Sequence, residues 1–132
     1  GTPSKEIACE FFLEGEPVLT PTSPAPSDHR YLIALEDSSV AVSSTEEVEQ
    51  LVQKFPRFES ACRRFAEDRL GYAMRFNERL KQLSPMGKYE FLLAERPDLV
   101  RRLPQHILAS YIGMAPETLS RLRGQIANRF LD

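Results

Sequence analysis

The spacing of hydrophobic residues changes along the chain. In the first forty-five residues, short apolar stretches at 7–12, 31–35 and 40–42 alternate partly with polar residues. Such stretches, separated by turn residues such as 36–39, predict strands. The segment 17–26 contains four prolines, which cannot donate ladder hydrogen bonds. We therefore expect this segment to be a loop or the edge of a sheet.

From residue 45 onward the apolar residues recur at helical spacing. Ser44 or Thr45 followed by two glutamates predicts a helix start, and the apolar pattern continues to Phe55. Pro56 interrupts this short helix. Residues 57–83 contain no proline and predict one long helix, about 40 Å in length at roughly 1.5 Å per residue.

The long helix carries a narrow stripe with a seven-residue repeat. Two series of positions, offset by four residues, predict an a/d seam over about three heptads. Its members are Cys62, Ala66, Arg69, Ala73, Phe76, Leu80 and Leu83. The other faces of the helix are charged, which favours a dimer seam over packing within one domain. Arg69 is expected to extend out of the seam or to pair with a carboxylate of the partner.

The segment 105–123 has the pattern of a helix-turn-helix. A small residue, Ala109, lets two helices cross closely, and Gly113 permits the left-handed backbone of a tight turn. A second helix is predicted to begin near Pro116. The apolar residues that would fill the motif are Leu108, Ile112, Met114, Leu119 and Leu122. An ordinary helical hairpin with a glycine turn is the alternative.

The outer side of this second helix carries side chains that can recognise bases. Glu117 can accept a hydrogen bond from cytosine, Arg121 can donate two to guanine, and Ser120 can reach a base or a phosphate. A pair between Glu117 and Arg121 within the helix is the structural alternative, and both can hold. The predicted contacts to the DNA backbone are Lys88, Arg101, Arg102, Thr118, Arg123 and Arg129.

Composition and charge narrow the class of protein. The 132 residues are 42% hydrophobic and 27% charged, which is typical of a soluble globular protein. The net charge is −4 over residues 1–83 and +2 over 84–132, so the predicted DNA-binding part is the more basic one. No apolar run is long enough to span a membrane and no signal peptide is visible. We expect a reduced, cytoplasmic setting.

Other chemistry is sparse. His29 and His106 are isolated, so no metal site is expected. Cys9 and Cys62 are too few for a disulfide framework or an iron–sulfur cluster. No nucleophile and base can be paired by their positions in the sequence, so no enzymatic activity is expected.

The sequence also resembles a known family. Residues 117–121, Glu-Thr-Leu-Ser-Arg, resemble the E-x-x-S-R recognition-helix motif of the Crp–Fnr transcription regulators. The order of predicted strands, the stretch 34–38, a short helix, a long helix and a helix-turn-helix is similar to that of the family. Residues 11–16 resemble the segment that enters the family's effector pocket. The resemblance covers essentially the whole chain.

This resemblance implies an α+β fold in three parts. They are a partial cyclic-nucleotide-binding-like β-roll at 1–55, a dimerisation helix at 56–83 and a winged helix-turn-helix at 84–132. Only eight residues follow Gly124, which leaves no room for a full wing. Family members extend further at the N-terminus, so the sequence resembles their C-terminal portion. The implied function is a prokaryotic regulator that binds a palindromic operator in promoter DNA as a homodimer, with RNA polymerase as a further partner.

The resemblance also places an effector pocket at Gly15, Glu16 and Arg30. The proline-rich segment after Glu16 replaces the family's phosphate cradle, so no cyclic-nucleotide cofactor is expected. Two other functions stay open at this point. One is a protein–protein interaction module that uses the same helical fold without DNA, and the other is a cyclic-nucleotide sensor domain.

Overall fold

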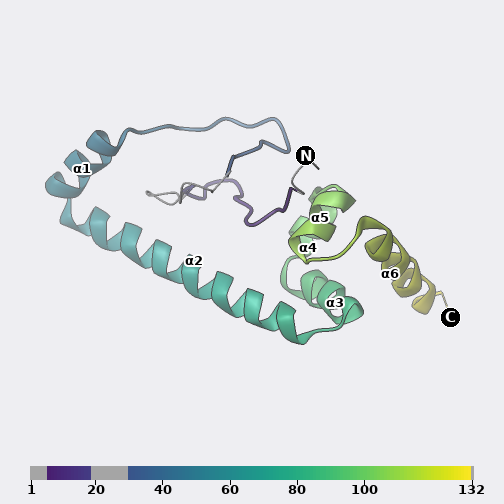
Figure 1. The fold of residues 1–132 in the computed structure, drawn as a ribbon. Helices are drawn as coiled ribbons and strands as arrows, with labels where there is room; N and C mark the ends of the chain where they lie inside the picture. The colour runs from purple at the N-terminus through teal and green to yellow at the C-terminus, as the bar shows by residue number, and fades with distance from the viewer. Residues whose placement is uncertain (1–5, 19–29, 132) are drawn as a thin grey trace, which may run out of the picture. The chain divides into compact units, whose positions relative to one another are not determined.

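A computed structural model describes residues 6–18 and 30–131 of the chain (Figure 1). This part is 65% helical and contains six helices and no strand. In order, the helices are α1 (Thr45–Lys54), α2 (Pro56–Gln82), α3 (Pro85–Glu95), α4 (Pro97–Arg102), α5 (Gln105–Tyr111) and α6 (Pro116–Arg129). Among the residues described, every helix is too short or too polar to cross a lipid bilayer.

Local sequence signals explain where the helices begin. Ser44 caps α1 with two reciprocal hydrogen bonds. Its hydroxyl accepts from the backbone N–H of Glu47 at 3.2 Å, and the Glu47 carboxylate accepts from the backbone N–H of Ser44 at 2.8 Å. Ser84 caps α3. Pro85 and Pro116 occupy the first positions of α3 and α6, where a missing N–H costs no helical hydrogen bond. The helix starts predicted at Ser44 or Thr45, at residue 57 and near Pro116 are confirmed to within one residue.

The predicted β-roll is wrong for the described residues. The stretches 7–12, 31–35 and 40–42 form no strand. A strand needs a neighbour to satisfy its backbone and cover its apolar side chains. Here the residues of 31–35 and 40–42 are exposed, and Val42 is 88% exposed. Residues 19–26 of the proline-rich segment lie outside the described residues.

The α+β class is therefore replaced by a mostly helical one. The wing is also not seen, because Phe130 and Leu131 form a turn after α6 in the described chain.

The chain divides into two compact units. One unit combines the described parts of residues 1–17 and 77–132, and the other contains those of 18–76. The helix α2 runs through the boundary, and its observed bounds agree with the predicted helix over 57–83 to within one residue.

The unit that contains α3–α6 has a continuous apolar core. Its fully buried side chains come from all four of these helices: Leu92, Leu99, Leu108, Ile112 and Leu119. α5 and α6 pack on each other, and both α4 and α6 contact α3. Leu108, Ile112, Leu119 and Leu122 are thus confirmed as core residues, while Met114 is half-buried. This packing fixes the position of α6.

Candidate nucleic-acid interface

The turn between α5 and α6 has the geometry that the sequence predicts. Gly113 has a φ of 72°, a conformation that other residues rarely adopt. The N–H of Met114 donates to the carbonyl of Ala109 at 2.9 Å, and the N–H of Gly113 donates to the carbonyl of Ser110 at 3.3 Å. These two bonds define a Schellman motif, which closes the end of α5 and redirects the chain into α6. The two predicted helices and the glycine turn between them are confirmed.

One side of α6 is buried and the other faces solvent. Leu119 and Leu122 pack into the core. Glu117, Ser120 and Arg121 are exposed on the opposite side. Within residues 6–18 and 30–131, neither Glu117 nor Arg121 has an ion-pair partner, so the alternative pair within the helix is not formed. All three predicted base-reading residues are therefore brought together and accessible.

Arg123 is placed differently from its predicted contact with the DNA backbone. It is half-buried, and its guanidinium donates hydrogen bonds to three helices. The acceptors are the Tyr89 hydroxyl of α3 at 3.2 Å, the Val100 carbonyl of α4 at 3.3 Å and the Gln105 side-chain oxygen of α5 at 3.3 Å. The guanidinium also lies 5.9 Å from the centre of the Tyr89 ring. Arg123 thus fastens α6 to the rest of the unit.

Gln105 extends this network to the start of α6. Its side-chain nitrogen donates to the carbonyl of Pro116 at 3.1 Å. Sequence reasoning missed both Gln105 and Tyr89. Their partner Arg123 lies 18 and 34 positions away, respectively, and no local pattern connects residues so far apart.

The other side chains predicted to contact the DNA backbone differ in their exposure and in their ion pairs. Lys88 lies beside the turn, because a β-carbon on Gly113 would lie 3.9 Å from its Nζ. Arg101 is exposed and Thr118 is half-buried. Arg129 pairs with Glu90 of α3 at 3.1 Å.

Arg102 forms a bidentate pair with a residue of the N-terminal segment. Its two terminal nitrogens donate to the two Glu14 carboxylate oxygens at 2.7 and 3.0 Å. The hydrogen bond from Arg102, together with its charge and the Glu14 backbone N–H, lowers the pKa of Glu14 from 4.5 to about 2. The sequence gives no local signal for this pair, because its members are 88 positions apart.

The predicted effector residues do not form one site within a unit. Gly15 has a φ of 78° in a turn, and the Glu16 carboxylate closes that turn by accepting the Leu13 N–H at 2.9 Å. Arg30 belongs to the other compact unit. In the described chain, no three His, Cys, Asp or Glu side chains gather closely enough to hold a metal ion.

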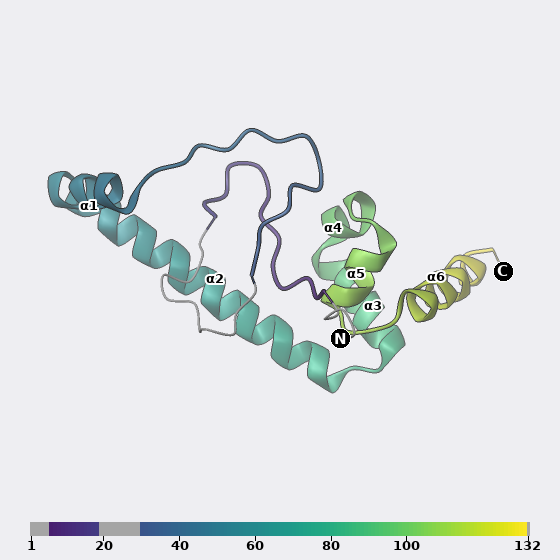
Figure 2. The ribbon, with the colours of Figure 1, turned by 45° about the horizontal axis from the view of Figure 1, so that its top comes forward.

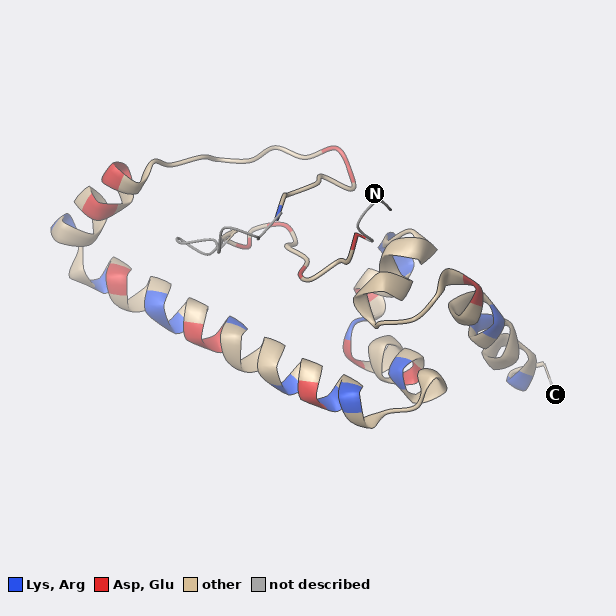
Figure 3. Cartoon of the chain, viewed as in Figure 1, with Lys and Arg blue, Asp and Glu red and all other residues tan. Residues whose placement is uncertain are grey.

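The predicted dimer seam is exposed at one end and covered at the other. Cys62 and Ala66 are exposed, and Phe76 and Leu80 are buried within the single chain. Arg69, Ala73 and Leu83 are half-buried. Lysines, arginines and acidic residues lie along α2 between these positions (Figure 3).

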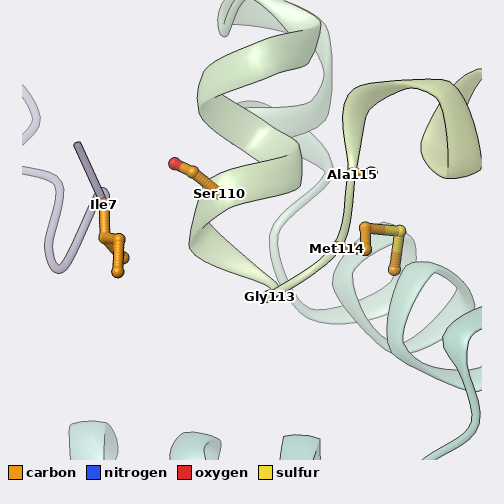
Figure 4. A pocket seen from close by; sticks show the side chains of 5 residues that line it. All are labelled: Ile7, Ser110, Gly113, Met114 and Ala115. Atoms are coloured by element: carbon orange, nitrogen blue, oxygen red, sulfur yellow. The ribbon is translucent and has the colours of Figure 1, made fainter. Parts of the chain in front are cut away.

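A small hollow lies beside the helix-turn-helix turn. Figure 4 shows that its wall combines the turn with the N-terminal segment, and the lining residues are Ile7, Ser110, Gly113, Met114 and Ala115. The Ser110 side chain points toward the segment that carries Ile7.

In comparisons with known proteins, no family model, curated protein or solved structure matches the chain.

Proposed function

We propose that this protein is a sequence-specific DNA-binding transcription regulator of the Crp–Fnr type. It acts in the cytoplasm and binds a palindromic operator as a dimer. The observation that carries the proposal is the outer side of α6, where Glu117, Ser120 and Arg121 are exposed together. The opposite side of the same helix is held by a buried core and by Arg123.

This arrangement suits insertion into a major groove. An arginine without an ion-pair partner can offer both of its terminal donors to the O6 and N7 atoms of guanine, and a free glutamate can accept from cytosine. The start of α6 has no side-chain cap, so its first N–H groups are available to a phosphate. Lys88 and Arg101 add positive charge on neighbouring elements.

The dimer is proposed to form through the exposed part of α2. Cys62 and Ala66 lie there, together with half-buried Arg69 and Ala73. Because Phe76 and Leu80 are already covered within one chain, they support the helix rather than the partner contact. Two chains would present two α6 helices to successive major grooves, about 34 Å apart.

The decisive experiment compares two arginine variants on two duplexes. A sequence selected from random DNA and a scrambled version are each titrated at two salt concentrations. Arg121→Ala should lose roughly 1–3 kcal/mol per half-site on the selected duplex and relax the preference at one base pair. Arg101→Ala is the matched control, since it removes the same charge. It should weaken both duplexes alike and reduce the salt slope by about one.

Two results would contradict this proposal. Equal weakening of both duplexes by Arg121→Ala means that Arg121 does not read bases. Absence of binding to any selected duplex by the parent protein means that the chain has another function.

That other function would be a protein–protein interaction module. The observation in its favour is a run of exposed apolar side chains on α1, on the residue that ends it and on the first turn of α2. They are Val48, Leu51, Phe55 and Phe58, each at least 38% exposed. Apolar surface of this kind favours contact with another protein and contributes little to binding a phosphate backbone.

A further inference from the structure

The N-terminal segment, residues 6–17, is docked on the helix-turn-helix unit through α4 and α5. The backbone N–H of Ala8 donates to the Ser110 hydroxyl at 3.1 Å. The ring of Phe11 packs edge-on against Tyr111, with centroids 4.9 Å apart at 80°. Both ribbon views show this purple segment beside α5 (Figures 1 and 2).

The segment is shaped so that it presents a carboxylate. The positive φ of Gly15 and the bond from the Leu13 N–H to Glu16 close a tight turn. Glu14 stands in that turn, and both of its carboxylate oxygens meet Arg102 at the end of α4. The docked segment therefore combines an aromatic anchor with an acidic residue three positions later.

The edge of the Arg102 guanidinium formed by its two terminal nitrogens can hold only one bidentate partner at a time. Its planar fork matches a carboxylate and a phosphate equally well, because both offer two oxygens at a suitable spacing. With Glu14 in place, the two terminal nitrogens of Arg102 are engaged. A phosphate of the DNA backbone can take this same bidentate position only after Glu14 has left.

We propose that the α4–α5 face is a docking surface for an acidic, aromatic segment. Residues 6–17 occupy this surface and compete with the DNA backbone for Arg102. The inference rests on the proposed DNA binding and adds a means of regulating it, since any event that detaches the segment frees a phosphate contact. The contact is weak enough to be displaced, because the Glu14 side chain is 75% exposed and its pair with Arg102 is open to salt.

The test measures DNA affinity of the full chain with three variants. Glu14→Gln removes the competing charge and should tighten binding about two- to fivefold at low salt, the range expected for a partly exposed ion pair. Glu6→Gln is the matched control, since it removes one negative charge from the same segment at an exposed position. Its effect should be smaller. Phe11→Ala removes the aromatic anchor and should act in the same direction as Glu14→Gln.

A second measurement follows the Glu14 carboxyl by NMR titration, with and without a duplex. Its pKa should be about 2 in the free protein and return toward 4.5 in Arg102→Ala. Added duplex should produce the same rise in the parent protein, because DNA takes Arg102 from Glu14.

The outcomes separate the inference from the proposed function. If DNA binds but Glu14→Gln and Glu6→Gln tighten it equally, the effect is general repulsion and the competition is wrong. If DNA binds without changing the pKa of Glu14, the segment stays docked and the competition is also wrong. If no duplex binds any variant, the proposed function itself fails, and the competition fails with it.

Discussion

Arg121 and Arg123 lie two positions apart on α6, and the fold gives them different environments. Arg121 is exposed without an ion-pair partner in the described chain, whereas Arg123 donates to acceptors on α3, α4 and α5. Both are arginines on a helix of basic character, and the sequence predicts a DNA contact for each, to a base for Arg121 and to the backbone for Arg123. Their directions relative to the core differ: Arg121 faces solvent, and Arg123 positions the helix.

Arg123→Ala should therefore act through the fold rather than through charge. Removing the guanidinium leaves the partly buried oxygens of Tyr89, Val100 and Gln105 without this donor. The free energy of unfolding should fall by about 1–3 kcal/mol. DNA binding should weaken while its salt slope stays the same, since no phosphate contact is lost. Denaturant unfolding and titrations at two salt concentrations measure both quantities.

Arg121→Ala is the control for this variant. Because Arg121 is exposed and contributes nothing to the core, its removal should change stability by no more than about 0.5 kcal/mol. A drop in salt slope of about one unit in Arg123→Ala would instead show that Arg123 contacts phosphate.

The pair between Glu14 and Arg102 should respond to acid. The pKa of Glu14 is lowered to about 2 by the hydrogen bond and charge of Arg102, and its ordinary value is 4.5. A lowered pKa in the folded state means that the contribution to docking is present above about pH 4.5 and is lost as the pH falls toward 2. NMR shifts of the Phe11 and Tyr111 rings should follow this loss. In Glu14→Gln the shifts of these two rings should show no such change between pH 4.5 and pH 2, because the carboxyl group that titrates is absent.

At the scale of the element, the helices were predictable and the strands were not. Capping residues and prolines act over three or four positions, so Ser44, Pro85 and Pro116 mark helix starts in any context. A strand depends on pairing with another strand far along the chain, and the apolar stretch 31–35 forms no strand in the described structure. The same limit applies to the site: Gly113 has a local signal, whereas the long-range contacts of Arg102 and Arg123 have none.

The turn between α5 and α6 offers a test at this scale. Gly113→Ala places a β-carbon at a φ of 72°, which should cost about 1–2 kcal/mol of stability. Crowding is not the reason, since the nearest atom is the Lys88 Nζ at 3.9 Å. Gly124→Ala is the matched control in the middle of α6, where the added methyl meets nothing within 4 Å. It should stabilise the helix by up to about 1 kcal/mol. Equal effects at the two positions would contradict the role assigned to the turn.

At the scale of the whole molecule, the proposed dimer can be tested with the two cysteines, which are both exposed. A parallel seam through α2 would bring Cys62 of one chain close to Cys62 of the other. A short bismaleimide should therefore link two chains in the parent and in Cys9→Ser, but not in Cys62→Ser. Sedimentation should show a dimer before cross-linking. A monomer, or a link that depends on Cys9, would contradict the seam.

The docked N-terminal segment also has a consequence for synthesis. Ala8 and its partner Ser110 are 102 positions apart, so the segment leaves the ribosome long before the surface that receives it exists. At about 5–20 residues per second, that interval is roughly 5–20 seconds. The contacts among α3–α6 join residues that are close together in the sequence, so they can form before the segment docks. Residues 6–17 therefore wait for their native contacts until α4 and α5 have been translated, and the nascent α3–α6 unit passes through a stage in which Arg102 is uncovered.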